Sequence, residues 1–146
     1  MAAPLHLIKL CVGADEVADL VTWQAARIAE YRASGRDPRP RHVTRMWPKR
    51  EAEILAGGSL YWVFKGLVLA RQPIAGFEPQ QGEDGIRRCA ILLDPGVIRT
   101  VPQPRRPFQG WRYLRPEDAP GDLAPGPDAA GLPPKMLADL ALIGVL

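Results

Sequence analysis

The 146-residue sequence has few of the residues that build metal centres and disulfide frameworks. It contains two cysteines, Cys11 and Cys89, and two histidines, His6 and His42. No C-x-x-C or H-x-x-x-H spacing occurs, so we expect no metal site and no cofactor. Each cysteine lies in an apolar, strand-like run, and we therefore expect two reduced thiols in the core.

Long apolar runs and nucleotide-binding or hydrolase motifs are also missing. The longest runs, SLYWVF and AILL, are far shorter than the roughly 18 to 20 residues that cross a bilayer. The N-terminal segment has Lys9 as its one basic group and lacks the apolar region of a secretory signal, so we expect no membrane span and a cytoplasmic location. The absence of G-x-S-x-G, G-x-G-x-x-G and Walker motifs disfavours serine hydrolases, dinucleotide-binding proteins and P-loop proteins.

Lysine is scarce, whereas arginine is abundant and unevenly placed. Only four of the nineteen cationic residues are lysine. Residues 36–115 carry fifteen Lys or Arg against seven Asp or Glu, a net charge of +8, while the rest of the chain carries four against nine. Planar guanidinium groups suit bidentate contacts with phosphate or carboxylate, so this basic middle segment indicates an anionic partner.

The periodicity of apolar residues predicts both strands and helices. Strands are expected over 5–12, 42–47, 59–74 and 86–101, with Lys65 and Gly66 forming either a bulge or a hairpin turn. A long amphipathic helix is expected to begin after Asp15 as N-cap and to present the apolar stripe Val17, Leu20, Val21, Ile28 and Tyr31. A short helix is expected over 48–58 and a mobile loop over 76–85.

These elements predict an α+β fold with a small, strongly curved mixed or antiparallel sheet, or an open barrel, beside the long helix. We expect a single domain over residues 1–115, a proline-rich linker over 116–134, and a C-terminal helix over 135–146 that packs on the same domain. The sequence leaves the oligomeric state open.

Two clusters of cations and aromatic rings are candidates for binding RNA or another phosphate-bearing ligand. Guanidinium groups can hold phosphates while exposed rings stack on unpaired bases, and a helix N-terminus adds backbone N–H groups for an anion. The candidate ligand-binding residues are Arg45, Lys49, Arg50 and Lys65 in the first cluster and Arg105, Arg106, Trp111 and Arg112 in the second. In the alternative interpretation, the rings belong to the core and the cations are solvated or paired with acids.

The sequence leaves open whether the protein is an enzyme. Thr44, Lys49 and Lys65, with Glu83 or Asp84, would form a lysine-centred acid–base group if burial lowered the pKa of a lysine. A protein-interaction domain is a third possibility, and it predicts an exposed apolar patch.

Long segments of the chain resemble a family of short alphaproteobacterial proteins known as a domain of unknown function. The resemblance covers nearly the whole chain and rests on HLIKLCVG, RHVTRMWPKR, GGSLYWVFKG, RQPI, GEDGIRRCAILLDP and RRPFQGWRYLRPEDAPGDL. The order EILAGG, LYWVFKG and LVLARQPI, within residues 41–101, is similar to that of PUA-like domains of the ASCH and EVE type. This second resemblance implies a small barrel that binds RNA or modified bases. It also implies an alternative activity, because some ASCH-like proteins are amidohydrolases that use lysine, threonine and glutamate, here Thr44, Lys49 and Glu83.

Overall fold

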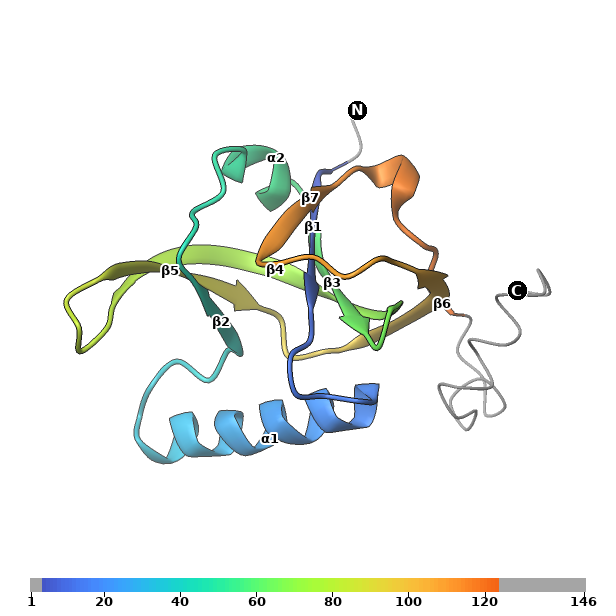
Figure 1. Cartoon of the computed structure of the whole chain (residues 1–146). Helices are drawn as coiled ribbons and strands as arrows, with labels where there is room; N and C mark the ends of the chain where they lie inside the picture. Colours follow the sequence, from blue (N-terminus) through green and yellow to red (C-terminus); the bar gives the residue numbers. More distant parts are fainter. Residues whose placement is uncertain (1–3, 124–146) are drawn as a thin grey trace.

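The computed structural model describes residues 4–123, which form two α-helices and a seven-stranded mixed sheet (Figure 1). The helices are α1 (Val17–Ala33) and α2 (Glu51–Leu55), followed late in the chain by the short 3₁₀ helix η1 (Pro116–Asp118). The strands are β1 (His6–Leu10), β2 (Arg41–Thr44), β3 (Ser59–Phe64), β4 (Leu67–Gln81), β5 (Arg87–Leu93), β6 (Ile98–Pro104) and β7 (Trp111–Leu114). This is a small α+β fold with an open sheet. Neither described α-helix combines the length and the hydropathy needed to cross a membrane.

The sheet curls so strongly that strands distant in its order come into contact. The strand order is β2-β5-β4-β3-β1-β7, and β6 pairs with β4. The β1 and β3 strands are parallel, and the other pairs are antiparallel. Although β5 and β4 separate β2 from β3, the ring of His42 in β2 lies 5.4 Å from that of Trp62 in β3.

The long β4 strand forms two hairpins. Lys65 and Gly66 have φ values of 47° and 84° and connect β3 to β4, which identifies the hairpin turn rather than the bulge. The predicted mobile loop over 76–85 is wrong, because β4 stays paired with β5 as far as the Gln81–Arg87 pair. Proline is tolerated at position 79 because, in the described chain, that part of β4 pairs on one side only, with β5.

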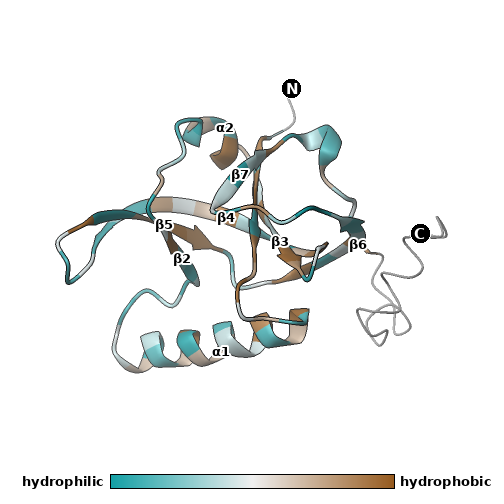
Figure 2. Ribbon diagram, viewed as in Figure 1, coloured by the Kyte–Doolittle hydropathy of each residue, from teal (hydrophilic) through white to brown (hydrophobic). Residues whose placement is uncertain are grey.

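Helix α1 packs on the sheet chiefly through its N-terminal end. Asp19 accepts hydrogen bonds from the backbone N–H groups of Asp15 and Glu16, both at 3.1 Å, and the N-cap is Glu16 rather than the expected Asp15. Within the predicted apolar stripe, Val17 and Leu20 are buried, whereas 46% of Val21 is exposed. Figure 2 shows the hydrophobic residues of α1 gathered near its start and hydrophilic ones further along. Helix α2 is shorter than the predicted 48–58.

Two clusters of apolar side chains form the core, one on each face of β3. Leu60, Trp62 and Phe64 belong to the larger cluster, and Tyr61 and Val63 belong to the smaller one. This is the alternation that a strand covered on both faces requires. Both cysteines are buried in the larger cluster as free thiols.

The chain after β7 folds back onto the sheet. Asp122 forms an ion pair with Arg71 of β4 at 2.7 Å. The N–H of Val101 donates to the carbonyl of Gly121 at 2.8 Å, and the N–H of Leu123 donates to the carbonyl of Arg99 at 2.9 Å. Residues 116–123 of the expected linker therefore pack against the sheet. The rest of that linker and the expected C-terminal helix lie outside the described residues.

Candidate functional site

The segments that hold the two predicted clusters meet at β7. The hydroxyl of Tyr113 accepts hydrogen bonds from the backbone N–H groups of Lys49, at 2.9 Å, and Arg50, at 3.2 Å. The indole N–H of Trp111 donates to the carbonyl of Met46 at 2.9 Å. These aromatic side chains therefore fix the backbone before α2.

Trp111 is only 6% exposed, which agrees with the alternative interpretation that its ring belongs to the core and leaves little of the ring for stacking on a ligand. The burial has a clear cause: Trp111 begins the edge strand β7, where it pairs with Lys9 of β1, and its indole joins the larger core cluster. Its polar N–H is satisfied by a backbone carbonyl, as a buried indole requires.

Several of the other predicted cations have local partners. The guanidinium of Arg50 binds Glu53, with one N···O distance of 2.8 Å, and lies over the ring of Tyr113. Arg112 lies over Phe108, with its guanidinium 5.6 Å from the ring centroid. Lys65 is 3.5 Å from Asp15.

The predicted ligand-binding residues fall into three groups. Arg45, which follows β2, forms a group by itself. Lys49, Arg50, Trp111 and Arg112 lie around β7. Lys65 and Arg105 lie at the β3–β4 turn, where the N–H of Arg105 donates to the carbonyl of Gly66 at 2.8 Å, and Arg106 follows. Within residues 4–123, no hydrogen bond or ion pair joins side chains of one group to those of another. The eight residues do not form one continuous site through direct contacts.

Arg45 lines a surface hollow together with arginines that the sequence analysis did not select. We call this site the arginine hollow; its lining residues are Arg45, Trp47, Arg87, Arg88 and Cys89. The guanidinium of Arg88 pairs with Asp84 at 2.7 Å. Neither Arg45 nor Arg87 forms an ion pair with a described residue. The indole N–H of Trp47 donates to Glu51 at 3.1 Å, which holds the ring in place.

The lysine-centred acid–base group is not assembled. Lys49 is exposed, and 70% of the Lys65 side chain is exposed, so neither has the burial that this chemistry needs. Thr44 pairs with Cys89 in the β2–β5 ladder, while Glu83 lies in the exposed turn between β4 and β5. Among described residues, no hydrogen bond or ion pair connects Thr44, Lys49 and Glu83. The partly buried lysine is instead Lys9, whose pKa is lowered by burial.

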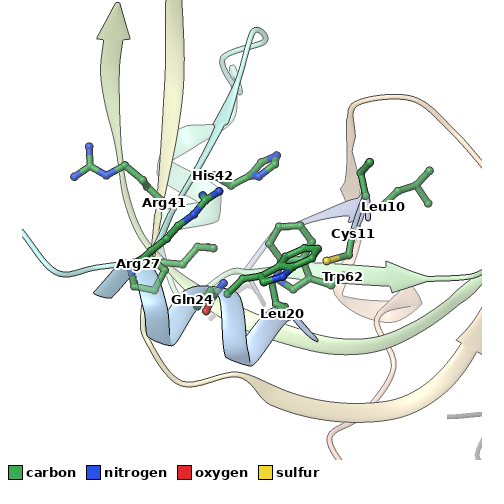
Figure 3. Close-up of a pocket in the computed structure, with 12 residues that line it drawn as sticks. Leu10, Cys11, Leu20, Gln24, Arg27, Arg41, His42 and Trp62 are labelled. Atoms are coloured by element: carbon green, nitrogen blue, oxygen red, sulfur yellow. The ribbon is translucent and has the colours of Figure 1, made fainter. Parts of the chain in front are cut away.

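A cavity of about 220 Å³ lies between α1 and the sheet. Its walls are side chains from α1, from the ends of β1 and β5, from the start of β2 and from the middle of β3. Figure 3 shows Gln24 and Arg27 of the helix facing the strand residues His42 and Trp62 across it. No pattern in the sequence predicted this cavity, because its lining residues come from five separate elements.

Gln72, fully buried in β4, organises one side of this cavity. Its side-chain oxygen accepts hydrogen bonds from the indole N–H of Trp62, at 2.9 Å, and from the amide of Gln24, at 2.8 Å. Its amide nitrogen donates to the side-chain oxygen of Gln24, at 2.7 Å, and to the carbonyl of Asp94, at 3.0 Å. The network fixes the positions of Trp62 and Gln24.

His42 and Cys11, two titratable residues that line the cavity, are neutral at physiological pH. Burial, reinforced by the positive charges of Lys9 and Arg27, lowers the pKa of His42 to about 4. Burial raises the pKa of the Cys11 thiol to about 11, so the reactive thiolate is scarce. The Nε2 atom of His42 is buried and has no hydrogen-bond partner in the described chain.

Residues 4–123 contain no group of three His, Cys, Asp or Glu side chains placed to hold a metal ion.

No curated protein and no solved structure matches this chain. The family model for a protein of unknown function (DUF1489) matches residues 7–146. The chain therefore belongs to the DUF1489 family.

Proposed function

We propose that this protein binds RNA, or another phosphate-bearing ligand, through the arginine hollow. The observation that carries the proposal is the charge of this site: three guanidinium groups line it, and one carboxylate, that of Asp84, pairs with one of them. Two positive charges are therefore left without a carboxylate partner in the described chain.

The local strand pairing explains why these charges gather. Thr44 pairs with Cys89 in the antiparallel β2–β5 ladder, so the residues that follow and precede them, Arg45 and Arg88, are neighbours across the ladder. Arg87 is the next residue along β5. A cluster of rigid, planar forks suits the bidentate recognition of phosphate oxygens better than a cluster of lysines does.

Two further observations favour RNA over a smaller phosphate compound. The segment 36–115 has a net charge of +8, and Lys49, Arg105 and Arg106 are cations in it that form no ion pair with a described residue. A long, flexible polyanion can contact such scattered charges in addition to the hollow.

Fluorescence anisotropy with labelled single-stranded RNA tests the proposal. We expect binding that weakens as salt increases, because each phosphate contact releases counterions. The double variant Arg45→Ala/Arg87→Ala should bind about tenfold or more weakly, and the slope of log K against log salt should fall by about 1 to 2.

The double variant Arg32→Ala/Arg36→Ala is the matched control, because it removes two exposed arginines at the end of α1, outside the hollow. It should keep most of the affinity. Equal losses in the two double variants would show that binding depends on net charge alone and would contradict a site at the hollow, as would the absence of any salt-sensitive binding.

A further inference from the structure

We propose that the cavity between α1 and the sheet binds a small molecule made of a flat aromatic ring with one anionic group. This site is separate from the arginine hollow, because none of the residues that line the hollow lines the cavity. The inference therefore does not depend on RNA binding.

The size of the cavity favours a small ligand. Its volume of about 220 Å³ is below the range of roughly 300 to 1,000 Å³ that is usual for drug-sized ligands. Protein interiors are normally filled to the density of an organic crystal. Here the helix buries only Val17 and Leu20, and its following turns border the cavity instead of filling it.

The cavity is held open by hydrogen bonds that do not involve a ligand. Gln72 binds both Trp62 and Gln24, which lie on the strand side and the helix side of the cavity. Neither Trp62 nor Gln24 can move into the cavity without breaking one of these hydrogen bonds. Breaking a buried hydrogen bond costs more free energy than breaking an exposed one, because water does not replace the lost partner. The site is therefore preorganised for a ligand.

Aromatic walls favour a flat ring. The rings of His42 and Trp62 meet edge to face, at 5.4 Å and 90°. Trp23 lies near the turn at Gly13, where a Cβ atom would come within 3.4 Å of the indole, and Trp23 remains 44% exposed although it lines the cavity. A flat ring can stack on or meet the edges of such walls, at the separations that aromatic pairs prefer.

Polar groups on the walls favour a ring that contains or carries hydrogen-bonding atoms. The bonds to Gln72 use one N–H and one lone pair of the Gln24 amide, which leaves one donor and one acceptor site. The Nε2 atom of His42 also has no partner in the described chain, but it is itself buried, so the Gln24 amide is the group that a ligand can reach.

The charge of the lining favours an anion. No acidic residue lines the cavity, while Arg27 and Arg41 both do. Arg27 forms no ion pair with a described residue, whereas the guanidinium of Arg41 lies 3.9 Å from Glu78 and 6.0 Å from the centroid of the Tyr31 ring, so Arg27 is the better placed to bind an anion. With His42 and Cys11 neutral, the two guanidinium groups are the charged groups of the lining, and an anionic substituent on the ligand would compensate them.

The exposed apolar side chains Val12, Val21 and Trp23 near the same end of α1 would also suit a protein partner. A flat protein surface would cover Val12 and Trp23 but would not reach the Gln24–Gln72–Trp62 network behind them. A small molecule can instead enter the cavity and contact Gln24 and Trp62, which favours the small molecule, and the variants below separate the two.

The experiment is an NMR titration that follows the indole N–H signals and the side-chain amide signals of the glutamines. The test ligands are benzoate and uracil-6-carboxylate, each of which joins a flat ring to an anionic group. Uracil is the control for the ring alone, and inorganic phosphate is the control for the anion alone. We expect at least one ring anion to shift the Trp62 and Gln24 signals and to bind about tenfold or more tightly than uracil or phosphate.

Two pairs of variants locate the site. Arg27→Ala should weaken ring-anion binding about tenfold, whereas Arg32→Ala, further along α1 and outside the lining, should not. Val12→Trp should block the entrance, because Val12 is 80% exposed and lines the cavity; Val21→Trp is the control, because Val21 is exposed but is not a lining residue.

The proposal is overturned if no ring anion shifts these signals at millimolar concentration. It is also overturned if Arg27→Ala and Val12→Trp bind as the wild type does, since binding would then lie elsewhere. Loss of RNA binding in the hollow variants bears on the proposed function only.

Discussion

At the scale of single residues, Gln72 shows how a buried polar group can hold several elements together. It links Trp62 of β3, Gln24 of α1 and the backbone of Asp94 after β5. Replacement by leucine keeps the approximate volume but leaves a buried indole N–H and a backbone carbonyl without partners. We expect Gln72→Leu to lower the free energy of unfolding by about 3 kcal/mol.

Chemical denaturation measures this loss. Gln109→Leu is the control, because Gln109 is exposed, and its effect should stay within about 0.5 kcal/mol. Equal stability of Gln72→Leu and the wild type would show that the network does not stabilise the fold.

His42 should make the stability depend on pH. Its pKa is about 4 in the folded protein, against an ordinary value of 6.5. As the pH falls through 6.5, the unfolded chain takes up a proton while folded His42 stays neutral, so stability falls until the pH reaches about 4. The total loss from His42 is about 3 kcal/mol, from the size of the shift.

His6 acts in the same direction, because burial and then the charge of Arg71 lower its pKa, and its Nδ1 accepts the N–H of Ser59 at 3.0 Å. To separate the contributions of His42 and His6, chemical denaturation of the wild type and of His42→Phe is measured above pH 6.5 and again between pH 6.5 and 4. The variant should lose less stability on acidification. The same pH dependence in both proteins would contradict the assignment to His42.

At the scale of elements, periodicity predicted where most strands lie, whereas local composition misled at two places. Residues 76–85 contain Gly76, Pro79 and Gly82, which are typical of a loop, yet pairing with β5 extends the strand through most of them. The apolar stripe of α1 predicted a helix packed along its length, but its buried residues are Val17 and Leu20, and the turns that follow them, as far as Arg27, border a cavity. Pairing and cavities depend on distant segments, which a local pattern does not contain.

Gly58 provides a test of the packing between α2 and β1. A Cβ atom there would lie 2.2 Å from the carbonyl oxygen of Leu5 and 2.6 Å from that of Ile54, and both are backbone atoms that cannot move independently. We expect Gly58→Ala to destabilise the protein by about 3 kcal/mol or more.

The control is Gly96→Ala, since a Cβ atom at position 96 meets nothing within 4 Å. Thermal unfolding of the two variants should differ clearly, with Gly96→Ala close to the wild type. Similar melting temperatures would mean that the backbone at Gly58 adjusts easily.

At the scale of the whole molecule, the folded state protects both cysteines. Burial raises the pKa values of Cys11 and Cys89 to about 11, and both thiols lie in the core. We expect a thiol reagent to label the native protein slowly and the denatured protein at both sites rapidly, because the thiolate is the reactive form. Fast labelling of the native protein would show that the core opens readily.

The candidate site was predicted only in part, because charge is visible in a sequence and side-chain direction is not. The basic middle segment and Arg45 were found from composition and spacing. Trp111 was a candidate ligand-binding residue with a place in the core as the alternative, and strand pairing with β1 turns it into the core. Arg87, Arg88 and the cavity residues Gln24 and Arg27 gain meaning only once the sheet curls and α1 crosses it.

The most direct test of the central claim follows the guanidinium Nε–H signals of the arginines by NMR while a short single-stranded RNA is added. The account predicts that the signals of Arg45 and Arg87 shift first and that the shifts disappear as salt is raised. It is contradicted if those two signals stay unchanged while RNA binds, or if arginines outside the hollow, such as Arg32 and Arg36, shift to the same extent.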